Sequence, residues 1–409
     1  MMEEIILFKD KKDCCGCGAC VNVCSKKAIT MQPDEYGFLY PQIDPEACVK
    51  CGACKKVCAY QDESKNGSKP MLAFVAANRN KEQIMNSASG GVFSAVATKF
   101  LIEGGVVFGA TLTFENGHAN PHHISIEVME DLPKLQGSKY VQSSIGECYK
   151  EAQTFLKQGR KVLFSGTPCQ VAGLYGFLRK DYDNLTTIDL ICHGVPNAEF
   201  FDGYIQVEKV KRKVKEIMGY AFRDKKKGWG MNGRIDMKNK KEKVCSVYVP
   251  ARLNSYNTLF LDGYTYRENC YSCRYARQNR ISDLTIGDYW GIEVEHPELL
   301  GVGGYDEKAG ISCVLVNTEK GKNLCASMEE LLRLDISEFE KVQRRNGQLI
   351  APSKKANGRE QILEIYKNNK YPGVEMFFQK RFKKQIVIHK IYNAVPRSFR
   401  LKLKKILKG

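Results

Sequence analysis

From residue 71 onward, apolar and polar positions alternate with two different periods. Short apolar runs predict strands at residues 71–78, 106–114, 124–129, 161–166 and 186–192. Stretches with a helical pattern predict helices between them, at residues 90–104, 145–159 and 197–213. Strands that alternate with helices in this way favour an α/β or α+β domain built on a mixed sheet.

The first sixty residues follow a pattern set by cysteine. The stretch CCGCGACVNVC, residues 14–24, recurs as CVKCGACKKVC, residues 48–58, which is an internal repeat. Each copy has the spacing of two-cluster ferredoxins, in which the last cysteine of each run binds the other cluster. The spacing therefore predicts two 4Fe-4S clusters, one on Cys14, Cys17, Cys20 and Cys58 and the second on Cys48, Cys51, Cys54 and Cys24.

Structural zinc is the competing interpretation, because eight cysteines could hold two tetrahedral ions. Two complete copies of the four-cysteine run are far more specific for a ferredoxin. One departure is that Ser25 and Ala59 stand where proline normally follows the fourth cysteine. Neither cluster needs Cys15, which we expect to be a small buried residue. The ferredoxin-like domain is expected to span residues 1–62, with a polar linker at 63–70.

Composition and charge narrow the function classes. The seventeen cysteines are an odd number and are clustered, which is atypical of a disulfide framework. Much of the net charge of +17 comes from residues 380–408, which contain no acid. Recurring apolar residues predict basic amphipathic helices, broken near Pro396, in a tail at 351–409. The tail could contact an acidic partner or a membrane surface, or lie solvated on the body.

Specific nucleic-acid binding is disfavoured, because aromatic stacking platforms and a reading module are lacking.

The N-terminus differs from a secretory signal, because it has two early acids and an apolar run of only four residues. No apolar stretch approaches the roughly 18 residues of a spanning helix. We therefore expect a cytoplasmic protein, which could form oligomers.

Four further cysteines lie in loops of the larger domain. Cys169 opens a helix after one predicted strand, Cys192 ends the next, and Cys270 and Cys273 have C-x2-C spacing. A helix N-terminus stabilises a thiolate, and the ends of successive strands meet at one edge of a sheet. Four thiols are enough for a third cluster. Two structural cysteines and a separate redox pair are the alternative.

Two other polar segments contain candidate residues. SASGG, residues 87–91, opens a helix, where free amides favour a phosphate group, although a plain serine cap would look the same. HANPHH, residues 118–123, is expected to be a turn and not a metal site.

These motifs occur in an order that resembles a known family. SASGG, LQGSKYVQS, GTPCQVAGL, DLICHGVP, C-x2-C-RYAR and DLTIGDYWG resemble the coenzyme F420 hydrogenase and dehydrogenase beta subunits, over roughly residues 1–350. The resemblance implies an iron-sulfur flavoprotein that uses FAD to pass electrons between a two-electron carrier and clusters. It implies an α+β chain: the two-cluster ferredoxin-like module, a mixed α/β flavin-binding domain at 71–155 and 156–350, and the basic helical tail.

Carried over residue by residue, the resemblance also assigns a site. It places Cys169, Cys192, Cys270 and Cys273 on a cluster near the flavin. Lys139 or Arg277 would favour reduced anionic flavin, and His193 could relay a proton or be held structurally beside Cys192. The implied FAD-binding residues are Ser87, Ser89, Gly90, Gly91, Ser94, Gly137, Ser138, Lys139, Tyr140 and Arg277; His193 and Lys139 are the catalytic candidates.

The expected function is electron transfer between clusters and FAD by an oxidoreductase. Ferredoxin, the deazaflavin coenzyme F420 or a similar carrier would be its redox partner. One alternative is a non-catalytic electron-transfer subunit of a larger complex. Another is a reductase associated with surface-polysaccharide biosynthesis.

Overall fold

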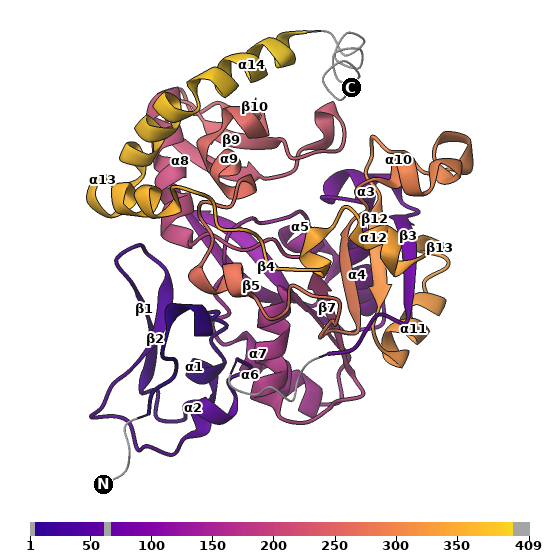
Figure 1. Cartoon of the computed structure of the whole chain (residues 1–409). Coiled ribbons are helices and arrows are strands. Elements are labelled where there is room, and N and C mark those ends of the chain that lie inside the picture. The colour runs from indigo at the N-terminus through magenta and orange to yellow at the C-terminus, as the bar shows by residue number, and fades with distance from the viewer. Residues whose placement is uncertain (1–4, 61–66, 396–409) are drawn as a thin grey trace.

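The computed structural model describes residues 5–60 and 67–395. A small N-terminal domain lies beside a larger body whose centre is an eight-stranded sheet (Figure 1). The expected mixed α/β architecture with C-terminal helices is confirmed. The expected linker at 63–70 lies partly outside the described residues.

The N-terminal domain consists of two short helices and one hairpin. Helices α1 (Ala19–Val23) and α2 (Ala53–Lys56) occupy equivalent places in the two cysteine runs. Each follows a left-handed glycine, Gly18 at φ 75° and Gly52 at φ 72°, a conformation that favours glycine. Strands β1 (Ile29–Pro33) and β2 (Leu39–Ile43) pair antiparallel, and the 3₁₀ turn η1 (Lys11–Asp13) precedes the first run.

The eight-stranded sheet has the order β13–β3–β12–β11–β7–β6–β4–β5. Neighbours from β11 to β4 pair parallel, and all other neighbours pair antiparallel. The parallel strands end at one edge, which is where sites form in such sheets. The strands are β3 (Leu72–Asn78), β4 (Val106–Glu115), β5 (His118–Ile126), β6 (Val162–Gly166), β7 (Leu185–Leu190), β11 (Leu284–Asp288), β12 (Ser312–Val316) and β13 (Leu332–Ser337).

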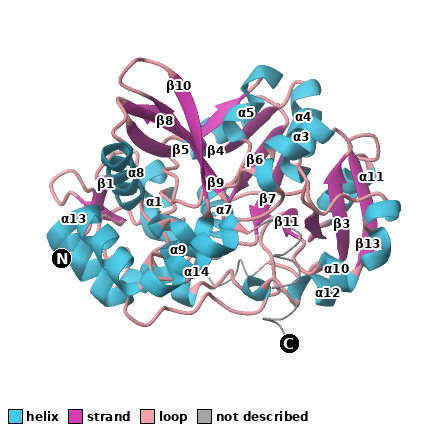
Figure 2. Ribbon diagram, turned by 90° about the horizontal axis from the view of Figure 1, so that it is seen from above, coloured by secondary structure: helices cyan, strands magenta, loops and turns pink. Residues whose placement is uncertain are grey.

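Helices cover both faces of this sheet (Figure 2). The alternation in β4 places Val107 in the core under α4 and Phe108 in the core under α6 and α7. The helices of this part are α3 (Lys81–Asn86), α4 (Val92–Ile102), α5 (Leu132–Leu135), α6 (Cys148–Lys157), α7 (Pro168–Leu178), α10 (Ile292–Glu295), α11 (Glu319–Ala326) and α12 (Phe339–Gln343).

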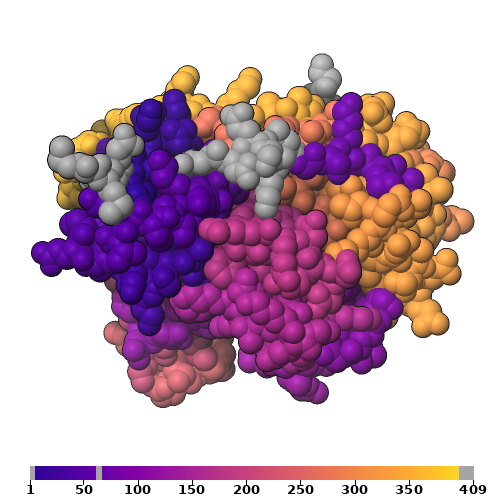
Figure 3. Space-filling model, turned by 90° about the horizontal axis from the view of Figure 1, so that it is seen from below, coloured from indigo at the N-terminus to yellow at the C-terminus, as the bar shows by residue number. Residues whose placement is uncertain are grey.

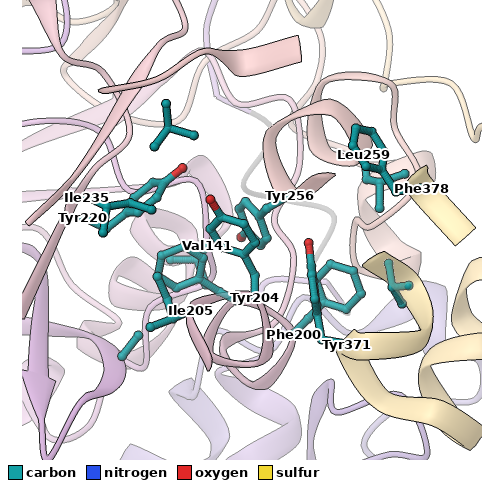
Figure 4. Close-up of a cluster of buried hydrophobic side chains, with 14 of the residues drawn as sticks. Val141, Phe200, Tyr204, Ile205, Tyr220, Ile235, Tyr256, Leu259, Tyr371 and Phe378 are labelled. Atoms are coloured by element: carbon teal, nitrogen blue, oxygen red, sulfur yellow. The ribbon is translucent and has the colours of Figure 1, made fainter. Parts of the chain in front are cut away.

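A third layer is built on an antiparallel sheet of β8 (Glu216–Ala221), β9 (Gly233–Lys238) and β10 (Val244–Val249). An aromatic core joins this sheet to helices α8 (Ala198–Arg212), α9 (Ser255–Leu261) and α13 (Arg359–Arg381). Figure 4 shows Tyr204, Tyr220, Tyr256 and Tyr371 converging there.

The C-terminal helices belong to this core. Helix α13 kinks at Lys370, whose φ is 51°, and α14 (Lys383–Ala394) follows it. Phe378 and Ile386 are buried on these helices, so the tail packs against the body up to residue 395. The predicted break near Pro396 and the rest of the tail lie outside the described residues.

The predicted strands and helices of the body are present, with one error. HANPHH was predicted to be a turn, but it forms the first part of β5 and pairs with β4. Ala119, Pro121 and His123 alternate toward the interior, which is the period of a half-buried strand. The prediction failed because HANPHH was interpreted as the link between the predicted strands at 106–114 and 124–129, whereas it is itself part of the second strand of that hairpin.

Candidate functional site

The first cysteine quartet lies around one small cavity. Cys14, Cys17, Cys20 and Cys58 all line it, so the last cysteine of the second run joins the first run. Burial raises the pKa of the Cys20 thiol, and the thiols of the other three raise it further. The structure thus brings together the four residues that the ferredoxin spacing predicts for one cluster.

The second quartet lies nearer the surface. Burial raises the pKa of the Cys54 thiol, with Cys48 and Cys51 as neighbouring charges. Cys24 packs against the same small core as Cys54, and Cys51 is exposed. Cys24 therefore lies near Cys54, and the exchange of the last cysteine between the runs stays a prediction.

Among residues 5–60 and 67–395, no group of three or more His, Cys, Asp or Glu side chains is arranged to hold a single metal ion. Four thiolates around a four-iron cluster lie farther apart than those around one zinc ion, whose Zn–S distance is about 2.3 Å. The finding therefore concerns single ions and not clusters.

A large cavity of about 450 Å³ opens at the ends of the parallel strands. Cys169, Cys192, Cys270 and Cys273 all line it, although they come from three separate segments. Their thiols influence one another: burial raises the pKa of the Cys270 thiol, and Cys192 and Cys273 raise it further. The four cysteines therefore lie around one cavity, and their binding of a third cluster stays a prediction.

The fold explains where these cysteines lie. Thr167 caps α7 in a reciprocal pair with Gln170, and Pro168 occupies the first turn, so Cys169 lies at the helix start. A hydrogen bond from Cys15 is the main cause that lowers the pKa of Cys169 to about 7. Cys192 follows β7, and Cys270 lies in the 3₁₀ segment η5 (Glu268–Ser272).

Most of the residues predicted to bind FAD line the same cavity. Those that do are Ser87, Ser89, Gly91, Gly137, Ser138, Lys139 and Tyr140, and His193 lines it as well. Burial lowers the pKa of Lys139 to about 7, and its ammonium group donates to the Lys134 and Gln136 carbonyl oxygens at 3.3 and 2.9 Å. A lysine that titrates near neutral pH is a common feature of functional sites.

Three predicted residues do not line the cavity. Gly90 lies in the loop before α4, packed against β3 and β12, and its amide donates to Ser312 Oγ at 2.9 Å. Ser94 is buried, and its hydroxyl donates to the Gly91 carbonyl oxygen at 2.9 Å. Arg277 is absent from the lining residues, whereas Arg280 is among them. Arg280 is buried and pairs with Asp189 at 3.0 Å, because the loop returns to the sheet at that point.

Sequence reasoning missed His123, which lines the cavity from β5. Its Nε2 lies 3.1 Å from the Ser165 carbonyl oxygen, and its Nδ1 lies 2.9 Å from the Ser143 hydroxyl. Nε2 therefore carries the proton, and Nδ1 accepts from the serine. Burial lowers the pKa of His123 to about 4, so the ring is neutral at pH 7. Strand alternation through 118–126 is the signal that could have found it.

A second group at the cavity surrounds Asp288 and Trp290. Trp290 lines the cavity and stacks on Trp229 at 4.6 Å between ring centres. Asp288 accepts hydrogen bonds from Trp229 Nε1 at 3.0 Å and from Arg223 at 2.9 Å. Arg223 also donates to the Tyr140 hydroxyl at 3.1 Å. These contacts join the loop after β8 to the end of β11, a pairing that sequence separation conceals.

Comparisons with known proteins match both parts of the chain. Residues 13–61 match the family described as 4Fe-4S dicluster domain. Residues 159–342 match the family described as the C terminus of the coenzyme F420 hydrogenase/dehydrogenase beta subunit. The predicted resemblance is therefore confirmed.

One curated relative is the coenzyme F420-dependent sulfite reductase of Methanocaldococcus jannaschii, 25% identical over 349 residues. The match covers 84% of this chain and 50% of that protein, so the chain spans about half the length of this relative. A chain of the F420-reducing [NiFe] hydrogenase complex from Methanosarcina barkeri is 16% identical, with a TM-score of 0.37 over 79% of this chain and 96% of that one. None of the helices in the described ranges is long and apolar enough to span a membrane.

Proposed function

We propose that the protein is an iron-sulfur flavoprotein oxidoreductase with three 4Fe-4S clusters and one FAD. The observation that supports this proposal is that the core cysteine quartet and most of the candidate flavin residues line one cavity, with the dicluster domain packed beside it. Bound clusters would carry single electrons, and bound flavin would exchange one or two, so the pair can connect a one-electron donor to a two-electron carrier.

The lining residues fit a flavin nucleotide. Ser87, Ser89 and Gly91 surround the start of α4, an eleven-residue helix whose first amides and dipole favour a phosphate. Lys139 and Arg280 are basic residues of the lining, Arg280 being already paired with Asp189, and Tyr140 stacks on Phe260 at 4.9 Å beside the cavity. The volume is within the usual 300–1,000 Å³ of cofactor sites.

Lys139 and His193 are the proposed acid–base residues. Burial lowers the pKa of Lys139 to about 7, so this lysine can hold or release a proton near neutral pH. His193 lines the cavity with an exposed side chain, and its carbonyl oxygen is fixed by a 2.5 Å hydrogen bond from Ser353. His123 stays neutral and oriented, so its role would be to shape the wall and not to transfer protons.

The second ferredoxin cluster is the proposed contact point for a protein carrier. Cys51 is exposed, and Lys50, Lys55 and Lys56 are exposed around it. Such a surface favours an acidic partner, such as a ferredoxin, and predicts salt-dependent association. A deazaflavin would instead enter the large cavity directly.

Anaerobic purification followed by iron, sulfide and flavin analysis tests the proposal. Three clusters predict about twelve irons per chain, at four per cluster, together with one FAD. Cys169→Ser should lower the iron content by about four, whereas Cys325→Ser changes a buried thiol on α11 and should leave it unchanged. Flavin-free protein would contradict the enzyme assignment, and about eight irons in the parent protein would remove the third cluster.

A further inference from the structure

Arg267 lies between the first cysteine quartet and the core quartet. Its side chain is completely buried, at 0% exposure. Its Nε donates to the Cys14 carbonyl oxygen at 2.9 Å, and one terminal nitrogen lies 3.8 Å from Cys14 Sγ. The guanidinium also lies over the Tyr40 ring, 4.0 Å from its centre. On the other side, the Cys270 amide donates to the Arg267 carbonyl oxygen at 2.9 Å, so Arg267 contacts one residue of each quartet.

The charge of Arg267 is balanced differently from the charges of the other buried arginines. Arg223, Arg280 and Arg359 each form an ion pair with a carboxylate, at 2.9 to 3.0 Å. Arg267 forms none with any carboxylate in residues 5–60 and 67–395; its polar side-chain partners there are Cys14 and Gln142. A buried cation is costly unless an anion compensates it. The group beside it that can become an anion is the thiol of Cys14, whose Sγ lies 3.8 Å from a terminal guanidinium nitrogen.

We propose that Arg267 compensates the negative charge of the cluster on Cys14, Cys17, Cys20 and Cys58 and raises its reduction potential above that of the second cluster. Four thiolates give a bound cluster a net negative charge, which grows when an electron is added. A fixed cation beside Cys14 stabilises the reduced form more than the oxidised form. Hydrogen bonds to cluster sulfurs act in the same direction.

The two quartets differ in exposure and in the buried cation beside them. The second quartet includes the exposed Cys51, and no buried arginine in the described ranges contacts it. Electrons that enter at the second cluster would therefore move to the first, which lies beside the core quartet. This inference rests on the proposed function for the direction of flow. It needs only the two clusters of the dicluster domain for the potential difference itself.

The test is a redox titration of the anaerobic, cluster-loaded full chain, followed by electron paramagnetic resonance, with iron content measured for each protein. Arg267→Gln should lower the reduction potential of the first cluster. The equilibrium distribution of one electron between the two clusters should shift at least tenfold toward the second cluster, which corresponds to about 59 mV for a one-electron couple. Arg267→Lys keeps the charge and should retain most of the difference. Arg359→Gln is the matched control, since Arg359 also contacts this segment but is paired with Glu268.

A further variant keeps the arginine, in case Arg267→Gln loses the first cluster. Gln142 Oε1 lies 3.4 Å from Arg267, so Gln142→Glu places a carboxylate against the guanidinium. This variant should also lower the potential, because the new anion cancels the cation. Full iron content with unchanged potential in Gln142→Glu, or an Arg267→Lys protein that behaves like Arg267→Gln, would overturn the proposal. Absence of flavin would contradict the proposed function and leave this result intact.

Discussion

Gly173 and Cys17 touch where the N-terminal domain meets the body. A β-carbon added at Gly173 would lie 2.9 Å from Cys17 Sγ, and one at Gly176 would lie 2.2 Å from the Val57 carbonyl oxygen. Cys17 belongs to the first cysteine run and Val57 to the second, so both halves of the domain rest on α7. Figure 3 shows the domain, in indigo, packed against this part of the body. Because α7 begins beside Cys169, it fixes the spacing between the first quartet and the core quartet.

Gly173→Ala should loosen this junction. The new methyl group would meet Tyr149 Oη at 2.7 Å as well as Cys17, and overpacking of this kind costs about 1–3 kcal/mol of unfolding free energy. Denaturant unfolding should show the loss. Gly347→Ala is the control, since a β-carbon there meets nothing within 4 Å. Equal stability of both variants would show that the junction is not close-packed.

The sequence predicted the parts of this site that depend on local spacing. Two copies of a four-cysteine run specify the glycine-linked loops at Gly18 and Gly52, because the ligands lie within a few residues of one another. Strand–helix alternation likewise placed Cys169 and Cys192 at one edge of the sheet. Each of these features depends on a short, continuous segment of the chain.

Features that depend on distant contacts could not be predicted in this way. Cys15 had no expected role beyond burial, yet its thiol interacts with those of Cys17 and Cys169 and lowers the pKa of both. Arg280, and not Arg277, reaches the cavity, because the direction of that loop is set by its ion pair with Asp189 on the neighbouring strand. The role of Arg267 depends on two residues far away in the sequence, Cys14 and Gln142. No local pattern carries that information.

The proposed exchange of the last cysteine between the runs leads to a second prediction. Cys58→Ser should remove the first cluster, although Cys58 belongs to the second run, and Cys24→Ser should remove the second. Each variant should lose about four irons. Besides the proposed core cluster, each variant keeps one N-terminal cluster; the one kept in Cys58→Ser has the exposed Cys51 and should be stripped faster by an iron chelator than the one kept in Cys24→Ser. Identical stripping rates would contradict the assignment of ligands.

The ion pair of Arg280 and Asp189 should be essential to the stability of the eight-stranded sheet. Both side chains are at most 1% exposed, and their charged atoms lie 3.0 Å apart. Asp189→Asn leaves the guanidinium buried without its counter-charge, which typically costs about 3–5 kcal/mol. Glu319→Gln breaks an exposed pair with Lys322 and should cost about 1 kcal/mol or less. Urea unfolding of both variants would measure the difference, and a loss below about 1 kcal/mol in Asp189→Asn would refute the prediction.

Lys225 should make the free energy of unfolding depend on pH in the alkaline range. Burial lowers its pKa to about 7, and its ammonium group donates to the Ile84 and Ser89 carbonyl oxygens at 2.6 and 2.5 Å. The unfolded chain keeps an ordinary lysine pKa of about 10.4, so between about pH 7 and about pH 10 the unfolded state binds more protons. The contribution of Lys225 to stability therefore rises with pH across that window.

Comparison of the parent protein with Lys225→Met isolates this contribution, because cysteines titrate over the same range in both. Unfolding free energies measured at several pH values from about 7 to about 10 should rise more steeply in the parent. Lys226→Met is the control, since Lys226 is exposed in the same 3₁₀ turn and should preserve the parent's slope. Parallel curves for the parent and Lys225→Met would mean that Lys225 stays charged in the folded protein.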